Sequence, residues 1–127
     1  MKNIIFIAPP AAGKGTISEY LVKNYHYEHI ATGDLLRDEQ ASGTSLGNMI
    51  AAIIRSGSLV TDDIVIRLVE EKLESKESGK PFILDGFPRT EAQAYSLDKM
   101  LKRKNIDNKL VIYLDATVHV ILKRVAG

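Results

Sequence analysis

The chain has 127 residues, 45% of them hydrophobic and 26% charged, with a net charge of +1. This length suits one domain, or one domain with a small insertion. The balanced charge gives no electrostatic reason to expect nucleic acid or an acidic membrane surface as a partner. The absence of cysteine excludes disulfides and thiol chemistry and suits a cytosolic enzyme. No apolar run approaches membrane-spanning length, so we expect a cytoplasmic protein with no membrane partner.

The first motif is the loop at residues 8–16, which reads Ala-Pro-Pro-Ala-Ala-Gly-Lys-Gly-Thr. It follows an apolar stretch at 4–7 that predicts a buried strand, and it precedes a helical pattern at 17–24. A strand, a tight loop and a helix are the context of a P-loop, whose backbone N–H groups bind phosphate. Lys14 would then contact the β- and γ-phosphates of a nucleotide, and the Thr16 hydroxyl would ligate Mg²⁺.

This loop departs from the pattern G-x-x-x-x-G-K-[ST] at two places. Ala8 stands where the first glycine is expected, and Gly15 stands directly after the lysine. The alternative interpretation is an ordinary strand–turn–helix with a solvated lysine. We favour the phosphate loop because the strand-to-helix context and the Gly-Lys-Gly-Thr run occur together.

The remaining pattern alternates strands with helices. We predict further strands at 28–30, 82–84 and 110–114, and helices at 34–40, 45–55, 62–75, 91–104 and 117–125. Such alternation indicates an α/β fold with a mostly parallel sheet and right-handed crossovers. The stretch from 31 to 60 contains helical patterns and no strand, so it is predicted to be an insertion.

A second motif, Asp-Gly-Phe-Pro-Arg-Thr, begins at Asp85 directly after a predicted buried strand. Ligands of such sheets bind beyond the carboxyl ends of the strands, where a carboxylate could hold Mg²⁺ directly or through water. Gly86 permits close backbone approach to a ligand, and Arg89 offers a planar fork for phosphate. Thr90 and Gln93 also form a capping box, a structural role for Gln93 that competes with ligand binding and that local sequence favours.

A third motif, Thr-Gly-Asp-Leu-Leu-Arg, begins at Thr32 after the weak strand at 28–30. The Thr32 hydroxyl and the Arg37 guanidinium could together bind a second anion. The alternative is that Asp34 simply caps the helix while Arg37 lies in solvent.

Five segments resemble the adenylate kinases in order and spacing, and the match covers the whole chain. They are Gly13–Thr16, Thr32–Arg37, Gly57–Val60, Asp85–Thr90 and Gln93. The resemblance implies a P-loop NTPase-type parallel sheet with flanking helices. Its core would comprise residues 1–30 and 61–127, and residues 31–60 would form the AMP-binding insertion. It also implies the reaction ATP + AMP ⇌ 2 ADP with Mg²⁺ as the cofactor, in the service of nucleotide homeostasis.

The same resemblance implies a role for each matching residue. ATP would contact Ala11, Ala12, Gly13, Lys14, Gly15, Thr16 and Arg124. AMP would contact Thr32, Arg37, Ile54, Ser58, Leu59, Val60, Gly86, Phe87, Pro88, Arg89 and Gln93. Lys14, Arg89, Arg124 and Asp85 would serve catalysis, and Thr16 and Asp85 would hold the metal. The three histidines have no metal-ligand spacing and are predicted to have surface or core roles.

The resemblance further implies that the chain stops where the family's LID begins, so that the last strand, the LID and the final helix have no counterpart. We therefore expect weak nucleotide binding, little activity, and an open edge at 110–114 through which the chain could associate. The intact enzyme is expected to be a monomer. Two alternatives remain at this point: a UMP/CMP-type nucleoside monophosphate kinase, and a non-catalytic nucleotide-binding fragment.

Overall fold

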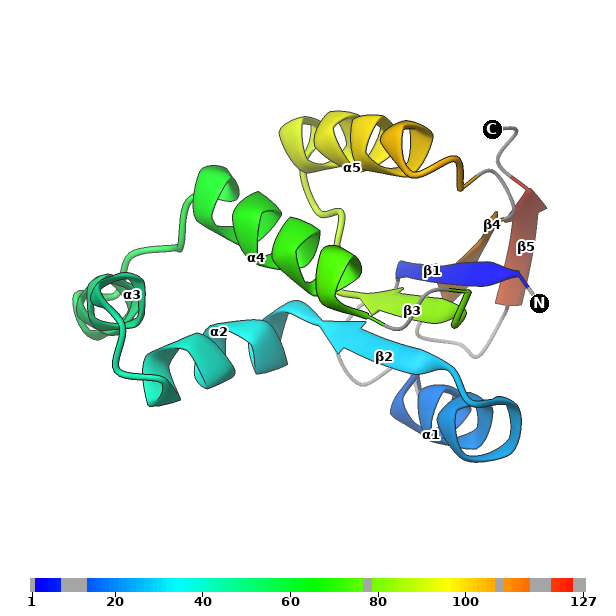
Figure 1. The fold of residues 1–127 in the computed structure, drawn as a ribbon, viewed down its shortest axis with the longest axis horizontal. Helices are drawn as coiled ribbons and strands as arrows, with labels where there is room; N and C mark the ends of the chain where they lie inside the picture. Colours follow the sequence, from blue (N-terminus) through cyan, green and yellow to red (C-terminus); the bar gives the residue numbers. More distant parts are fainter. Residues whose placement is uncertain (1, 8–13, 77–78, 107–108, 115–119, 125–127) are drawn as a thin grey trace.

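The computed structural model describes residues 2–7, 14–76, 79–106, 109–114 and 120–124 (Figure 1). For residues 14–16, 114 and 120–124 it describes the backbone alone. The elements in chain order are β1 (Asn3–Ile7), α1 (Lys14–Tyr25), β2 (Glu28–Ala31), α2 (Thr32–Ala41), α3 (Ser45–Arg55), α4 (Asp62–Ser75), β3 (Phe82–Asp85), α5 (Glu91–Arg103), β4 (Lys109–Leu114) and β5 (Val120–Arg124).

The sheet has the strand order β2-β3-β1-β4-β5. The first four of these strands are parallel, which confirms the predicted parallel α/β sheet. β5 runs antiparallel to β4, with Leu110 opposite Arg124 and Leu114 opposite Val120. All four predicted strands and the helices up to residue 103 are present within a few residues of their predicted bounds.

The predicted helix at 117–125 is wrong where the structure describes it, because residues 120–124 form β5. The predicted open edge at 110–114 is wrong for the same reason, since β4 pairs with β1 on one side and β5 on the other. The run Val-Ile-Leu at 120–122 suits a strand as well as a helix. Pairing with β5 satisfies the backbone N–H and C=O groups of β4 that would otherwise form an open edge of the sheet.

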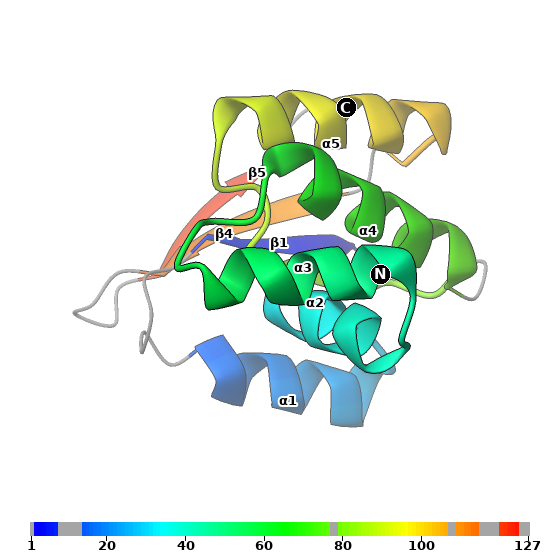
Figure 2. The same cartoon turned by 90° about the vertical axis from the view of Figure 1, so that its left-hand side faces the viewer.

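Side chains alternate between the two faces of the sheet, as the period of a strand requires. On one face, Ile4, Phe6, Ile83 and Ile112 pack with Ile17 and Leu21 of α1. On the other face, Ile5, Ile30, Leu84 and Val111 pack with Val69 and Leu73 of α4 and with Leu97, Met100 and Leu101 of α5. Figures 1 and 2 show the resulting layers, with α1 on one side of the sheet and α4 and α5 on the other.

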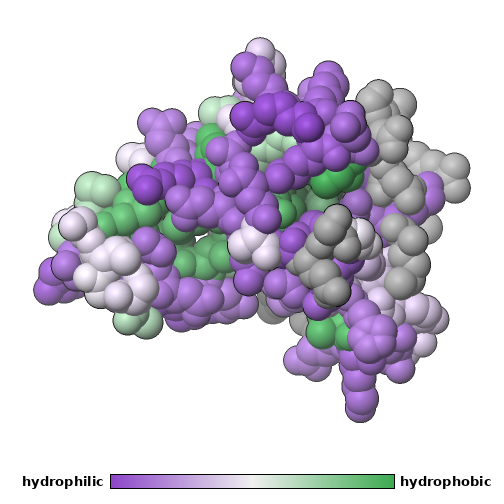
Figure 3. All heavy atoms as spheres, viewed as in Figure 1, coloured by the Kyte–Doolittle hydropathy of each residue, from purple (hydrophilic) through white to green (hydrophobic). Residues whose placement is uncertain are grey.

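The predicted insertion forms α2 and α3, which project beyond the carboxyl ends of β2 and β3 (Figures 1 and 2). The Thr44 hydroxyl caps α3 by accepting a hydrogen bond from the Gly47 amide at 2.9 Å. Gly47 is buried where α3 meets α2, and a Cβ atom there would lie 2.2 Å from the carbonyl oxygen of Glu39. The two helices therefore pack closely only because this residue lacks a side chain. In the space-filling view, hydrophobic side chains lie between the helices beneath a mainly hydrophilic outer surface (Figure 3).

Candidate active site

The centre of the candidate site is the carboxyl end of β3. Asp85 is the last residue of this strand, opposite Phe6 of β1 and Ala31 of β2. It therefore lies between the two strands that lead into the predicted phosphate loop and the predicted insertion. In doubly wound sheets ligands bind at this edge.

His29 is the neighbour of Asp85 that sequence reasoning did not identify. Its Nε2 lies 3.1 Å from Oδ2 of Asp85, and the Asp85 side chain is 9% exposed against 31% for His29. The carboxylate accepts this hydrogen bond. His29 and Ala31 point to the same face of β2, and Ala31 is opposite Asp85, so strand order and alternation together would have indicated the contact.

Gly86 lies where three elements converge. Its φ is +82°, a conformation that favours glycine, and it follows the buried strand directly. A Cβ atom on Gly86 would lie 2.9 Å from Oγ1 of Thr32 and 3.3 Å from Nη2 of Arg89. The Thr32 hydroxyl also lies 3.5 Å from the Gly86 carbonyl oxygen. The structure therefore brings the predicted residues Thr32, Gly86 and Arg89 together.

Arg37 lies beside the same cluster, one turn along α2. A Cβ atom on Gly33 would lie 3.3 Å from Nη1 of Arg37, so the guanidinium rests against the glycine that follows Thr32. Arg37 also pairs with Asp34, and both side chains are largely exposed. Asp34 is therefore not the cap of this helix, whose N-cap is Ala31. The Arg37 guanidinium thus lies against Gly33 and the Arg89 guanidinium near Gly86, and each offers a planar fork for an anion.

Gln93 contributes to the N-terminal cap of α5, as the capping-box pattern predicts. The Thr90 hydroxyl accepts a hydrogen bond from the Gln93 amide at 3.1 Å. The Gln93 Oε1 accepts a hydrogen bond from the Arg89 backbone amide at 2.7 Å, one residue earlier than the usual capping box would use. Gln93 is 6% exposed. Its side chain therefore holds the backbone of Arg89.

The other predicted AMP-binding residues differ in exposure. Leu59 is 92% exposed and Ile54 is 46% exposed, so both present apolar surface to solvent near α3. Ser58 and Val60 lie beside Leu59 in the connection to α4. Phe87, in contrast, is 1% exposed within the core, and its peptide bond to Pro88 is cis. Phe87 thus offers a ligand its backbone rather than its ring.

The predicted ATP-binding residues are described only in part. Ala11, Ala12 and Gly13 lie outside the described residues, while Lys14, Gly15 and Thr16 form the first turn of α1 in the backbone. The N-terminus of a helix of this length attracts phosphate. The backbone of Arg124 is opposite Leu110, near the amino end of β4 and away from the edge that holds Asp85. The structure therefore does not bring Arg124 to the other site residues.

A family model described as adenylate kinase matches residues 6–127. The chain belongs to the adenylate kinase family. It is 44% identical to an adenylate kinase of Kosmotoga olearia, 47% to one of Treponema denticola and 42% to one of Borreliella burgdorferi. Each alignment covers 98% of the chain but only 57–58% of the relative, so the chain spans rather more than half the length of these adenylate kinases.

The donor set at the carboxyl edge fits the magnesium ion that this adenylate kinase family uses with ATP. Mg²⁺ prefers carboxylate oxygen, water and substrate phosphate, and it rarely occupies a cage made wholly of protein ligands. Asp85 supplies a buried carboxylate at the expected place. Within the described residues no group of three His, Cys, Asp or Glu side chains gathers around a common point, so a caged metal is not indicated there.

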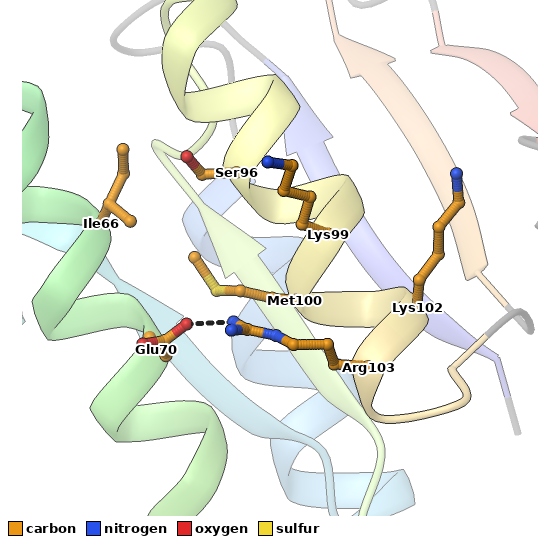
Figure 4. A pocket seen from close by; sticks show the side chains of 7 residues that line it. All are labelled: Ile66, Glu70, Ser96, Lys99, Met100, Lys102 and Arg103. Carbon is orange, nitrogen blue, oxygen red and sulfur yellow. Dashed lines mark hydrogen bonds and ion pairs between the residues drawn. The ribbon is translucent and has the colours of Figure 1, made fainter.

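A cavity of about 470 Å³ lies elsewhere, between α4 and α5 (Figure 4). Its lining comprises Ile66, Glu70, Ser96, Lys99, Met100, Lys102 and Arg103, and an ion pair between Glu70 and Arg103 crosses it. None of the predicted nucleotide-binding residues contributes to it. The charged groups also have partners, since Lys102 pairs with Asp98 and Lys99 lies over the Tyr95 ring. This cavity is therefore separate from the candidate active site.

Among the described helices, none has both the length and the apolar character needed to cross a bilayer.

Proposed function

We propose that this chain carries the acceptor site and the phosphate loop of an adenylate kinase, which catalyses reversible phosphoryl transfer between ATP and AMP to form two ADP. The observation that carries the proposal is the convergence of Thr32, Gly86 and Arg89 at the carboxyl edge of the sheet. The Thr32 hydroxyl, the Gly86 backbone without a side chain and the bidentate Arg89 guanidinium are groups that suit a nucleoside monophosphate. The enzyme would serve nucleotide homeostasis in the cytoplasm.

The acceptor side of the site is assigned to α2, α3 and the loop that contains Gly86. Arg37 and Arg89 would bind the AMP phosphate, and the exposed apolar side chains of Ile54 and Leu59 would pack against its base. Residues 31–60 would therefore be the AMP-binding insertion, and residues 1–30 with 61–127 the core.

The donor side is assigned to the start of α1. The backbone N–H groups of its first turn and the charge of Lys14 would bind the ATP phosphates. Asp85, with the Thr16 hydroxyl, would hold Mg²⁺ directly or through water. When bound with the nucleotide, Mg²⁺ neutralises phosphate charge. A contribution from Arg124 would require residues 120–124 to leave β4, because their pairing holds them near the opposite edge of the sheet.

The proposed chemistry needs no general base from the protein. The AMP phosphate is already a nucleophile, so catalysis consists of positioning the two nucleotides and stabilising charge during transfer. Arg89 would serve both purposes, since its backbone amide is fixed by Gln93. The two substrates must also be brought into line and shielded from water, which is a task for mobile parts in enzymes of this kind.

Calorimetric titration of the chain with ATP, AMP and UMP tests the proposal, followed by measurement of ADP formation. We expect AMP to bind about 10²-fold or more tightly than UMP, because polar groups shaped for one base are left unpaired by another. Equal or tighter binding of UMP would favour the UMP/CMP-type kinase. Binding of AMP and ATP without any ADP formation would favour a non-catalytic nucleotide-binding role for the chain by itself.

A further inference from the structure

A hydrogen-bond network joins the N-terminus of α4 to the N-terminus of α5. Oδ1 of Asp62, the first residue of α4, accepts a hydrogen bond from Nε2 of Gln93 at 2.8 Å. Its Oδ2 accepts a hydrogen bond from the Thr90 hydroxyl at 3.1 Å. The Gln93 Oε1 accepts from the Arg89 amide at 2.7 Å. Asp62 of α4 therefore holds the NH₂ group of the Gln93 carboxamide, and the Arg89 backbone before α5 holds its carbonyl group.

The chemistry of these partners determines which way the carboxamide faces. A carboxylate only accepts hydrogen bonds, so Asp62 requires the NH₂ group of Gln93. A backbone N–H only donates, so Arg89 requires the Gln93 carbonyl. A flipped carboxamide would place two acceptors together at Asp62 and two donors together at Arg89. Both contacts would then become repulsive.

Burial keeps the carboxamide in this orientation. Gln93 is 6% exposed, so its side chain cannot turn toward a ligand without breaking both hydrogen bonds inside the protein. Breaking them would leave buried polar groups unpaired, which is costly. A nucleotide at the neighbouring residues Gly86 and Arg89 would therefore meet the Gln93 amide only in the orientation that Asp62 and Arg89 impose.

An amide held in this way still has one N–H and one carbonyl lone pair for a ligand. Adenine offers the complementary pair, because its 6-amino group donates while N1 and N7 accept. Hypoxanthine offers the reverse on its Watson–Crick edge, where O6 accepts and N1–H donates. We propose that Asp62 is a specificity-determining residue, a positioning residue that orients the Gln93 carboxamide for adenine and against 6-oxopurines. This inference rests on the proposed function, in which AMP is the acceptor.

Calorimetric titration with AMP and IMP tests this role in the wild-type chain and in two matched variants. Asp62→Ala removes the acceptor, whereas Asp63→Ala removes the same charge from the same helical turn at an exposed position. We expect Asp62→Ala to lower the ratio of AMP to IMP affinity by about fivefold or more, the lower end of what one bidentate base contact contributes. We expect Asp63→Ala to retain the wild-type ratio.

A second readout separates orientation from a general loss of structure. In Asp62→Asn the new amide oxygen can still accept from Nε2 of Gln93, so we expect part of the selectivity to return. The NMR signals of the Gln93 side-chain amide should exchange slowly in the wild type and faster in Asp62→Ala. An unchanged affinity ratio in Asp62→Ala, or an equal fall in Asp63→Ala, would overturn the role of Asp62 while leaving the proposed function intact. Absence of AMP binding in the wild-type chain would overturn the proposed function, and this inference with it.

Discussion

Thr32 and Gly86 meet across the carboxyl ends of β2 and β3. The Thr32 hydroxyl oxygen lies 3.5 Å from the Gly86 carbonyl oxygen and would lie 2.9 Å from a Cβ atom on Gly86. These two residues come from motifs more than fifty positions apart in the chain. Their contact connects the start of α2 to the loop that contains Arg89, and it leaves no room for a side chain between them.

Gly86→Ala should lower both stability and AMP affinity. The left-handed backbone of Gly86 costs an alanine on the order of 1–3 kcal/mol, and the new methyl group would also crowd Thr32 and Arg89. Thermal melting and AMP titration measure the two effects. Gly79→Ala is the control, because Gly79 has a similar φ of +81° but, among the described residues other than its chain neighbours, no atom within 4 Å of its Cβ position. If Gly86→Ala lowers thermal stability and AMP affinity no more than Gly79→Ala does, the crowding of Thr32 and Arg89 has no consequence.

In a form of the protein that includes the LID, Arg89→Ala should weaken AMP binding and reduce ADP formation on the order of 10³-fold or more, by analogy with other arginines of phosphoryl transfer. Arg89→Lys should restore little of this, since one ammonium cannot reproduce a bidentate fork. The control is Arg67→Ala, an exposed arginine on α4 that pairs with Glu71. Near-normal turnover in either Arg89 variant would contradict the role assigned to this residue.

Gly47→Ala should destabilise the α2–α3 pair, although alanine normally stabilises a helix relative to glycine by roughly 1 kcal/mol. The added Cβ would lie 2.2 Å from the Glu39 carbonyl oxygen, so the helices must separate. We expect a net cost of about 1–3 kcal/mol, measured by denaturant unfolding, with faster hydrogen exchange across residues 32–55. Asn48→Ala, at an exposed position of the same helix, should have no such cost. Equal stability of the two variants would show that the interface tolerates the methyl group.

Glu28 should contribute stability that disappears in acid. Burial by itself raises the pKa of Glu28. The hydrogen bonds and charges of Lys80 and Lys72 together lower the pKa by more than burial raises it, so it lies below the ordinary value. A depressed carboxyl pKa contributes stability above the unfolded-state pKa and loses it as pH falls through the folded-state pKa. Glu28→Gln should therefore unfold more easily than the wild type at pH 7.

The difference between Glu28→Gln and the wild type should shrink as the pH falls below about 4.3, the usual pKa of an unfolded-state glutamate. Urea unfolding at a series of pH values measures it. Glu19→Gln, at an exposed position of α1, is the control and should follow the wild type throughout. A stability difference that does not change with pH would mean that the charge of Glu28 contributes nothing.

The motifs of this chain were recognisable from the sequence because their chemistry is local. The apolar run at residues 110–114 and the helical spacing in α3 and α4 are periodic over short distances, so they predict strands and helices directly. The run that begins at Asp85 follows a buried strand, which places it at a carboxyl edge in any parallel sheet. The Thr90 cap of α5 likewise depends on residues only three positions apart.

Only the tertiary structure decided the contacts and conformations that depend on residues distant in sequence. Residues 120–122 have apolar side chains suited to a helix or a strand, and pairing with the edge of β4 determined the outcome. His29 meets Asp85 only because β2 and β3 are adjacent in the sheet. Gln93 has a capping pattern in the sequence, but its contact with Asp62 required α4 and α5 to start side by side. Local periodicity thus determines which elements form, whereas the hydrogen bonds between elements, which orient the polar groups of the site, exist only once the elements have packed.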